Sequence, residues 1–328
     1  MKKMKIITTM LLTAALAIGL LASCGGSDPA GSNDADDVFQ IGIIQLVEHD
    51  ALDAAREGFI AALRDEGINA EFDYQNAQRD IPTLSTIAQR FVNNNVDLVL
   101  AIATPSVQAI AAETETIPVV GTAITSYERA GVVYSNEEPR FNVTGASDMN
   151  PIEAQINLIL EFIPDLQTLG IVYSTNEPNS VYQAEIARDF AETLGLTVVE
   201  GTVTTTADVQ QNMLSIAGRS DAIFIPTDNT HADAMAVVAQ VSIDTGVPVF
   251  PGEENMTMVG GLATLGVNYF ELGYQSGLMA ATILRGEDEP ATMPIQFAQS
   301  YTYTINGYMV EQLNITVPER LLSYIANP

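Results

Sequence analysis

The chain has 328 residues, 47% of them apolar, which is enough for two folded domains. Its formal net charge of -28 excludes nucleic acid and anionic membrane surfaces as favoured partners. One cysteine and two histidines exclude internal disulfides, cysteine-based zinc sites and Fe–S clusters, and they argue against a histidine-rich metal site. We therefore expect no metal and no cofactor.

Residues 1–23 have the pattern of a signal peptide for export. Lys2, Lys3 and Lys5 form a positive start, and the apolar run Ile6–Leu21 is short for a membrane span. The run ends in the sequence LASC, which resembles the bacterial lipobox. That resemblance implies that Cys24 is lipidated and becomes the new N-terminus, and two acyl chains anchor a protein stably to a membrane. A plain secretory signal is the alternative.

A run of small, polar and acidic residues follows Cys24 and extends to residue 37. Such a composition cannot form a hydrophobic core, so residues 24–37 are predicted to be a flexible tether. The folded body is predicted to begin near Val38. We expect the protein at the extracytoplasmic face of the cell membrane, at the cell surface or in the periplasm, with the lipid as its only membrane contact.

From Val38 the chain alternates between strand and helix patterns. Val96–Ala103 is an almost unbroken apolar run, as expected for a strand covered on both faces. Thr104 suits the N-cap of the next helix and Pro105 its first position, so the free N–H groups near Ser106 could hold an anion. The other predicted strands are Phe39–Val47, Ala70–Gln75, Ile117–Ala123 and Val143–Gly145, and the helices are Ala51–Glu66, Ile81–Asn94 and one after Ser106. This order predicts a parallel, doubly wound sheet.

The same arrangement occurs a second time. The segment Leu169–Tyr173 corresponds to Ile41–Gln45, and Asp221–Pro226 corresponds to Asp97–Ile102. The second series has strands Leu169–Tyr173, Leu196–Glu200, Asp221–Pro226 and Val247–Phe250, and helices Tyr182–Thr193, Val209–Ala217 and one that starts within residues 227–230. An ordered series of matches predicts two α/β lobes, each with a doubly wound parallel sheet, and a ligand cleft between them.

The last part of the chain fits neither copy. Tyr269–Leu284 is a predicted helix whose Gly273 and Gly277 face a packed neighbour. The other predicted elements are the strands Gly260–Val267 and Met293–Ile305 and the short helices Met309–Leu313 and Pro318–Ile325. We interpret these segments as returning to the first lobe and then to the second. Lobe 1 is thus predicted as residues 38–147 plus about 268–296, and lobe 2 as 148–267 plus about 297–328.

Ligands of open α/β sheets bind beyond the carboxyl ends of the strands, so the loops there supply the candidate site. The helix starts at Ser106 and Ser180 offer N–H groups to a carboxylate, and four acids could pair with an ammonium. This set of groups suits a small zwitterion. The predicted ligand-binding residues are Gln45, Glu48, Thr104, Ser106, Ser126, Glu177, Asn179, Ser180, Asp228, Asn229 and Glu253. Alternatively, Asp228 and Ser180 are only helix N-caps, and Glu48 and Glu177 are solvated.

Enzyme hypotheses are weaker. The sequence contains no Gly-x-Ser-x-Gly elbow, no P-loop and no HExxH motif. The segment Glu48-His49-Asp50 could form a metal or acid–base cluster, and Glu48 and Glu177 could form a carboxylate pair across the cleft. A solvated loop, or a histidine that only lines the cleft, explains these residues more simply. We expect a binding protein and not an enzyme.

Two segments resemble a known family. They are GIIQLVEHDALDAAREGF at residues 42–59 and ATPSVQA at residues 103–109, followed by Tyr173, Glu177, Asn179-Ser180 and Asp228-Asn229. Together they resemble the substrate-binding lipoproteins of ABC importers of the tryptophan/tyrosine type over nearly all of residues 38–328. The resemblance implies a type I periplasmic-binding-protein fold, a free amino acid ligand, often Trp, Tyr or Phe, and permease and ATPase partners. It places ligand contacts at Thr104, Ser106, Asn179, Ser180, Asp228 and Asn229.

These expectations combine into one mechanism for a monomeric solute-binding protein. The ligand's carboxylate lies at the helix start of Ser106 or Ser180, and Asp228 binds its ammonium. Contacts with both lobes exist only in the closed form, so the ligand shifts the population toward closure, and the permease recognises that form. Ser126-Tyr127 stands where the family leads us to expect Asp-Pro, which leaves the ligand's side chain open. The alternatives are a receptor for a signalling partner and the same fold with a different polar solute.

Overall fold

The structure is a computed structural model that describes residues 38–327. The predicted signal peptide, the lipidated Cys24 and the predicted tether therefore lie outside the described residues. Within residues 38–327, no helix combines the length and the hydrophobicity that a membrane span requires.

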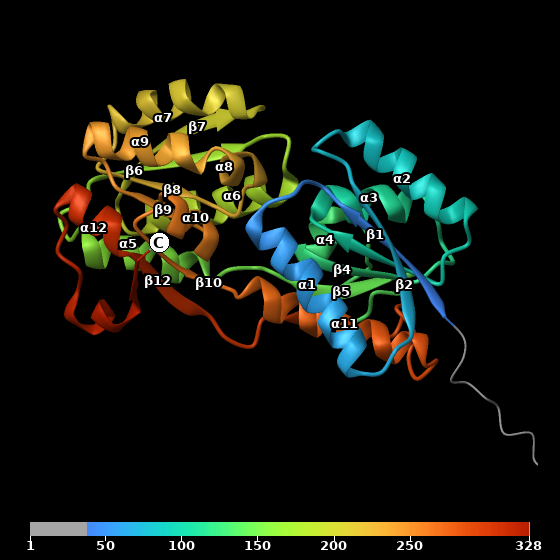
Figure 1. Cartoon of the computed structure of the whole chain (residues 1–328). Coiled ribbons are helices and arrows are strands. Elements are labelled where there is room, and N and C mark those ends of the chain that lie inside the picture. Colours follow the sequence, from blue (N-terminus) through green and yellow to red (C-terminus); the bar gives the residue numbers. More distant parts are fainter. Residues whose placement is uncertain (1–37, 328) are drawn as a thin grey trace, which may run out of the picture. The chain divides into compact units, whose positions relative to one another are not determined.

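The first half of the described chain forms one parallel sheet (Figure 1). Its strand order is β11-β5-β4-β3-β1-β2, and every neighbouring pair is parallel. The strands are β1 Phe39–Gln45, β2 Ala70–Asn76, β3 Leu98–Ile102, β4 Val119–Ile124, β5 Val143–Ser147 and β11 Gln296–Phe297. Strand β3 is buried along its whole length, which explains its unbroken apolar sequence. The predicted parallel sheet is confirmed.

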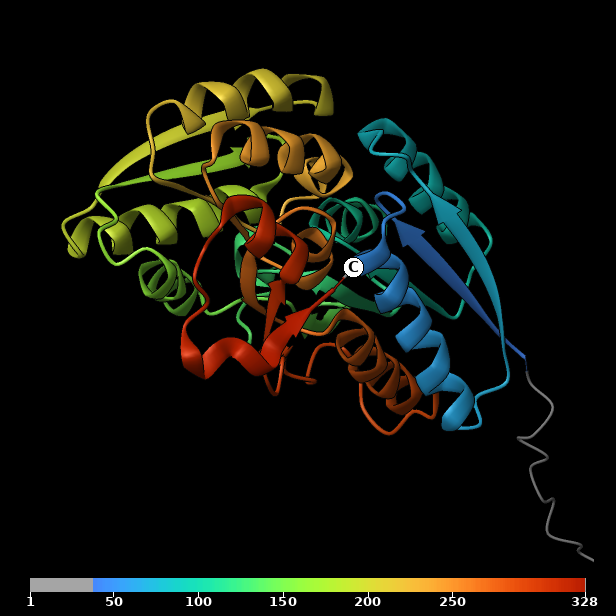
Figure 2. The same ribbon diagram turned by 60° about the vertical axis from the view of Figure 1, so that its left-hand side comes forward.

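Helices cover both faces of this sheet (Figures 1 and 2). Helices α2 (Ile81–Asn93) and α3 (Thr104–Glu113) lie together on one face. Helices α1 (Asp50–Asp65) and α11 (Tyr269–Leu284) pack together on the other, although they are far apart in the sequence. The short helix α4 (Tyr127–Ala130) follows β4. The sheet is therefore doubly wound, as predicted.

Helices α1 and α11 approach each other through glycines. A Cβ atom on Gly273 would lie 1.9 Å from the carbonyl oxygen of Ala55, and one on Gly277 would lie 2.6 Å from that of Phe59. On the facing helix, a Cβ on Gly58 would lie 2.0 Å from the carbonyl oxygen of Phe270. The prediction that Gly273 and Gly277 face a packed neighbour is confirmed, since only glycine lets these two backbones come so close.

The second half of the chain forms two further sheets. One is parallel, with the order β7-β6-β8-β9, and the other is mixed, with the order β10-β12-β13. The strands are β6 Thr168–Ser174, β7 Thr197–Val203, β8 Ala222–Ile225, β9 Val249–Pro251, β10 Ala263–Gly266, β12 Thr302–Asn306 and β13 Ile325–Ala326. The helices are α5 Ile152–Phe162, α6 Pro178–Thr193, α7 Val209–Ala217, α8 Asn229–Asp233, α9 Met235–Thr245, α10 Glu254–Val259 and α12 Gly307–Leu313, with 3₁₀ helices at Thr206–Asp208 and Glu319–Tyr324.

We call the first sheet with α1–α4 and α11 lobe 1, and the other two sheets with the remaining helices lobe 2. The apolar side chains around the lobe 1 sheet form one buried cluster that includes residues from 267–295. Two further clusters fill lobe 2. The chain passes between the lobes after β5, after β10 and after β11.

Several elements differ from their predictions for physical reasons. The predicted strand Met293–Ile305 is two strands in different sheets, because residues 298–301 carry the chain from lobe 1 to lobe 2. Helix α6 begins at Pro178 instead of Tyr182, since proline suits a first helical turn. The segment predicted as a helix to Ile325 ends in a 3₁₀ helix and a short strand. Helices α4, α5 and α10 were not predicted.

Candidate functional site

A small cavity lies where the carboxyl ends of the strands of both lobes meet. Its volume is about 20 Å³, which is room for about one water molecule. Lobe 1 and the segments that leave it supply His49, Ala51, Leu52, Thr104, Ala123, Asp148 and Tyr269, and lobe 2 supplies Asn179, Thr227, Asp228, Asn229, Ala232, Glu253 and Met256. The polar residues in this wall lie in the loops and helix starts that follow the carboxyl ends of the strands.

Three buried carboxyl groups line this cavity: Asp148, Glu253 and Asp228, the last of which belongs to a separate network described below. Asp148 follows β5 and accepts hydrogen bonds from the Tyr269 hydroxyl at 2.8 Å and the Thr125 hydroxyl at 2.9 Å. Burial raises the pKa of Asp148, and these two hydrogen bonds oppose that shift. The pKa of the Tyr269 hydroxyl is raised by burial and by the negative charges of Asp148 and Glu253. The three groups therefore interact electrostatically.

Glu253 has a second role as the N-cap of α10. Its carboxylate accepts hydrogen bonds from the backbone N–H groups of Asn255 at 2.7 Å and Met256 at 2.5 Å. Burial raises its pKa from 4.5 to about 7, although those hydrogen bonds favour the charged form. A carboxyl group with this pKa can be ionised near neutral pH when a positive charge comes close.

Several buried polar atoms around the cavity have no hydrogen-bond partner within the described part of the chain. Two of them lie in the cavity wall: the hydroxyl of Thr104 and the side-chain oxygen of Asn179. Asn150 is buried with both amide atoms unpaired, and it lies beside Gly266, next to Glu253. Leaving such groups unpaired costs free energy, so a ligand that pairs with them gains affinity.

The backbone around the cavity is strained at two alanines. Ala103, directly before Thr104, has φ 79°, and Ala123, in the cavity wall, has φ 56°. Residues with a Cβ rarely adopt positive φ, and such strain clusters at functional sites. Ala103 is also the N-cap of α3, so Thr104 is its first residue; the prediction of Thr104 as N-cap is wrong.

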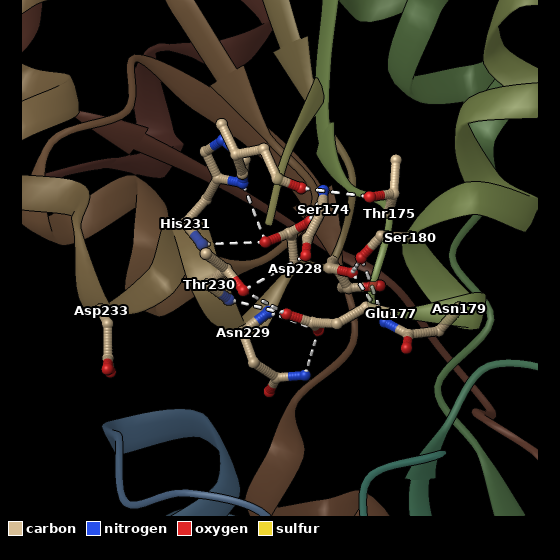
Figure 3. A network of polar contacts seen from close by, with 12 residues as sticks. Ser174, Thr175, Glu177, Asn179, Ser180, Asp228, Asn229, Thr230, His231 and Asp233 are labelled. Carbon is tan, nitrogen blue, oxygen red and sulfur yellow. Dashed lines mark hydrogen bonds and ion pairs between the residues drawn. The ribbon is translucent and has the colours of Figure 1, made fainter. Parts of the chain in front are cut away.

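Asp228 is the centre of a buried network beside the cavity (Figure 3). One carboxylate oxygen accepts the backbone N–H of Ser174 at 2.6 Å, and the other accepts the N–H and Nδ1 of His231, each at 2.8 Å. The predicted N-cap role of Asp228 is confirmed. Burial alone would raise the pKa of Asp228, but these hydrogen bonds lower it on balance. Both of its oxygens are already used by the protein.

Glu177 is buried and hydrogen-bonded, so its predicted exposure to solvent is wrong. Its carboxylate accepts the N–H and side-chain amide of Asn229 and the N–H and hydroxyl of Thr230 (Figure 3). Burial and the nearby charge of Asp228 raise its pKa. Glu177 therefore holds the first turn of α8, on which Asn229 lines the cavity.

We expect Asp228→Ala to destabilise the protein by about 3 kcal/mol, because it leaves the N–H of Ser174 and two groups of His231 buried without an acceptor. The matched control is Asp80→Ala, which removes an exposed N-cap of α2 that accepts only from Thr83, with an expected loss of about 1 kcal/mol. Urea unfolding measures both. Equal losses in the two variants contradict the network's role.

The structure brings only some of the sequence-predicted site residues together. Five line the cavity: Thr104, Asn179, Asp228, Asn229 and Glu253. Six do not: Gln45, Glu48, Ser106, Ser126, Glu177 and Ser180.

Local contacts explain why these six lie elsewhere. Gln45 is buried and bonded to Asp53 and Arg56 within lobe 1, and Glu48 is exposed and accepts from a tyrosine. Ser126 is the N-cap of α4. Ser180 donates to the carbonyl of residue 227 and is not an N-cap, since α6 begins earlier. Ser106 is buried within α3, and its N–H donates to the carbonyl of residue 103.

Sequence reasoning missed Asp148 and Tyr269, which form one wall of the cavity. A signal was present, because Asp148 directly follows the β5 strand, and residues at that position meet the other strand ends. Tyr269 begins α11, where the chain returns to lobe 1. No pattern in a single sequence shows that this return passes the cleft.

A larger cavity of about 640 Å³ lies elsewhere in lobe 1, near Pro118 and Val143 at the starts of β4 and β5. None of the residues in its wall is among the buried unpaired polar groups of the described residues. It is therefore a weaker candidate site than the polar cavity. Within residues 38–327, no group of three His, Cys, Asp or Glu residues is placed to hold a metal ion.

Two α/β lobes whose strand ends meet at a buried polar cavity define a solute-binding protein of the type I periplasmic-binding-protein class. The chain belongs to the family described as ABC transporter substrate binding protein, which matches residues 40–327. The resemblance inferred from residues 42–59 and 103–109 is thereby confirmed.

Similar proteins share nearly the whole described chain. A tyrosine-binding protein of Clostridioides difficile strain R20291 is 37% identical over 305 residues, which are 89% of this chain and 88% of that protein. The structure of an ABC domain from Streptococcus pneumonia in complex with L-Trp matches with TM-score 0.85 and 33% identity, over 89% of this chain and 99% of that one. The ligand-free, open structure of a substrate binding protein with adhesive properties from Clostridium difficile matches with TM-score 0.70 and 37% identity, over the same shares.

Proposed function

We propose that this protein is the extracytoplasmic solute-binding component of an ABC importer and that it captures a free aromatic amino acid between its lobes. The family supports the transport role. The ligand class is supported by the relatives, one named as tyrosine-binding and one solved with L-Trp. The observation that carries the proposal is the pair of buried acids, Asp148 and Glu253, in the wall of a cavity formed by both lobes.

The ligand's ammonium lies between Asp148 and Glu253 in this proposal. A buried cation needs a charged or hydrogen-bonding partner, and these two acids supply both. This assignment replaces the sequence-based hypothesis that Asp228 binds the ammonium. All three acids accept hydrogen bonds from the protein, but Asp228 also pairs with His231 and its pKa is lowered, whereas burial raises the pKa of Asp148 and of Glu253.

The carboxylate end lies near Thr104. The Thr104 hydroxyl is an unpaired donor at the first residue of α3, where the helix dipole also favours a negative charge. The Asn179 oxygen is unpaired, and its amide nitrogen donates to the carbonyl of Thr227. The unpaired Asn179 oxygen is an acceptor, so it can take a hydrogen bond from the ammonium, while the Thr104 hydroxyl donates to the carboxylate.

The side chain of the ligand lies against the apolar part of the wall. That part consists of Ala51, Leu52, Ala123, Ala232 and Met256. Methionine adapts its shape and makes favourable contacts with aromatic rings. The volume of about 20 Å³ is that of the closed protein without a ligand. The lobes must move apart to admit the ligand, and adaptable side chains of the wall such as Met256 shift to make room when the lobes close around it.

The remaining parts of the proposal concern the setting of this protein. Residues 1–23 direct export, Cys24 carries the lipid anchor, and the folded body acts as a monomer outside the membrane. The closed form delivers the amino acid to a membrane permease that is driven by ATPase subunits. The protein binds the amino acid without altering it, so it is not an enzyme.

A thermal-shift screen of the chain from Val38 onward against the twenty amino acids tests this proposal. A ligand at 100 times its Kd stabilises by about 2.7 kcal/mol, which raises the Tm by about 5 °C. We expect this shift with Trp, Tyr or Phe, and recovery of the amino acid unchanged. The corresponding amines and acids, which lack one charged group, are expected to give no shift. A shift with none of the amino acids contradicts the proposed function.

A further inference from the structure

Two residues of lobe 1, Arg79 and His49, contact helix α8 of lobe 2; His49 also lines the ligand cavity, whereas Arg79 lies outside its wall. Arg79 contacts the carboxylate of Asp233 at 2.5 Å and the backbone carbonyl of Asn229 at 2.6 Å. His49 Nε2 lies 2.9 Å from the side-chain oxygen of Asn229. We call these four residues, His49, Arg79, Asn229 and Asp233, the clasp.

Arg79 is held firmly on the lobe 1 side. It lies between β2 and α2 with φ 65°, next to Gln78 with φ 52°. The backbone N–H of Arg79 donates to the carbonyl of Leu46 at 2.8 Å. The backbone N–H of Ala77 donates to the carbonyl of Gln45 at 2.9 Å. Two successive residues with positive φ are unfavourable, and strain of this kind clusters at functional sites. The turn directs the guanidinium toward lobe 2.

Helix α8 is equally well held on the lobe 2 side. Glu177 and Asp228 bind the N–H groups of its first turn, while Asp233 points away from that network (Figure 3). Asn229 takes part in both sets of contacts, since its side-chain nitrogen donates to Glu177 and its oxygen meets His49. The clasp therefore joins a rigid turn of lobe 1 to a rigid helix start of lobe 2.

The Arg79–Asp233 pair differs from Arg129–Glu185, the other ion pair that joins the lobes within residues 38–327. The side chains of Arg79 and Asp233 are 24% and 32% exposed, whereas those of Arg129 and Glu185 are 59% and 41% exposed. Exposed pairs contribute little because water and salt screen them. Arg79 also has a second bond, to a backbone carbonyl, that Arg129 lacks among the described residues.

We propose that Arg79 is a positioning residue for ligand capture: through its contacts with Asp233 and Asn229 it stabilises the closed form, and so Arg79 sets ligand affinity without touching the ligand. This inference rests on the proposed function and deepens it. Arg79 and Asp233 are absent from the wall of the ligand cavity, while Asn229, which they hold, is part of it. The present structure is also more similar to the L-Trp complex than to the ligand-free, open relative.

The inference has a kinetic consequence. The apparent Kd equals the intrinsic Kd divided by the fraction of protein that is closed or able to close. Loss of the clasp therefore weakens binding, and it does so mainly by speeding ligand release, because the clasp forms only after the lobes meet. Binding to the open form stays unchanged.

The experiment compares Arg79→Ala, Asp233→Asn and the matched control Arg129→Gln in the chain from Val38 onward, which contains every element described here. Affinity and release rate are measured for the aromatic amino acid with the largest thermal shift. Closure is measured separately, without ligand, as the distance between spin labels on Thr86→Cys in α2 and Gln211→Cys in α7. Cys24 is the chain's only cysteine, so these are the only thiols.

For Arg79→Ala we expect about tenfold weaker binding, faster release and a shift of the ligand-free distances to longer values. Asp233→Asn changes all three in the same direction, and Arg129→Gln stays within about twofold of the wild type. Unchanged affinity and distances in both clasp variants overturn the inference, and so does an equal effect of Arg129→Gln. Binding of no amino acid refutes the proposed function instead, and the ligand-free distances still decide the role of the clasp.

Discussion

Glu253→Gln is expected to weaken the binding of the amino acid by about 100-fold at pH 8. The substitution keeps the size of the side chain and one of the two acceptor oxygens that receive the N–H groups of Asn255 and Met256, but it removes the negative charge next to the ammonium. Loss of one partner from a buried charge pair costs about 3 kcal/mol, which corresponds to this change in Kd. Isothermal titration of the wild type and the variant measures it.

The pH dependence of ligand binding follows from the ionisation of Glu253. Burial raises the pKa of Glu253 to about 7 in the free protein, and the ammonium binds the ionised form. Below pH 7 the carboxyl must lose a proton before it can pair, so the wild type is expected to bind about tenfold more weakly at pH 6 than at pH 8. The pKa of Asp148 is also raised, so its protonation at low pH weakens binding as well. Glu253→Gln flattens most of this profile.

The stability of the ligand-free protein should change in the opposite direction. The pKa of Glu253 is about 7 when folded and 4.5 as its ordinary value, so the folded state favours the protonated group. The resulting stability is complete below about pH 4.5 and is lost as the pH rises through 7, a difference of about 3 kcal/mol. Glutamine stays neutral, so the ligand-free variant is expected to unfold at higher urea concentration than the wild type at pH 8.

These opposite signs separate a lost ammonium partner from a folding defect. A variant that is merely misfolded loses both affinity and stability, whereas Glu253→Gln should lose the first and gain the second. The matched control is Glu254→Gln, one residue later in the same helix start and outside the cavity wall. Wild-type affinity in Glu253→Gln at pH 8 would show that the ammonium lies elsewhere.

The repeated arrangement of strands and helices could be predicted because parallel strands that are buried on both faces have uninterrupted apolar sequences. The run at Val96–Ala103 is apolar without interruption since β3 is covered on both faces. Gly67 and Gly195, which follow α1 and α6, have φ 70° and 80°, a left-handed backbone that glycine adopts readily where a helix ends. The α5 helix also has a clear pattern, with Ile152, Ile156 and Ile159 buried on one face, and it could have been found.

The joining of the lobes was harder to predict than the lobes themselves. The segment Met293–Ile305 alternates like one strand, but β11 and β12 pair with strands in different sheets. Alternation of apolar and polar residues indicates that a strand is buried on one face. It does not indicate which other strand it pairs with. Tertiary partners must be known before such a segment can be divided correctly.

The candidate site was predicted only in part, because position at a strand end does not determine where a side chain points. Asp228 and Glu177 both follow strands of lobe 2, yet their carboxylates turn inward to the backbone of α8 and its neighbours. Glu253 caps α10 and still contributes to the cavity wall. The difference depends on which N–H groups lie within reach, and that is a property of the folded structure.

Gly273→Ala is expected to destabilise the protein by about 3 kcal/mol or more. The new Cβ would lie 1.9 Å from the carbonyl oxygen of Ala55, well inside the contact distance, so α1 and α11 must separate. The two helices cover one face of the lobe 1 sheet, and Gly58 and Gly277 make equally close contacts along the same line. A local shift therefore cannot relieve the clash, and the loss spreads over the whole helix pair.

Urea unfolding of Gly273→Ala against Gly218→Ala provides the measurement and its control. Gly218 follows α7 with a helical backbone, and the atoms nearest to a Cβ there lie at 3.6 Å, which is ordinary contact. Its substitution should change stability by no more than about 0.5 kcal/mol. Because α11 begins at Tyr269 in the cavity wall, a shifted α11 should also weaken ligand binding. Equal stability of the two variants would show that the helix pair can open without loss, contrary to the packing described here.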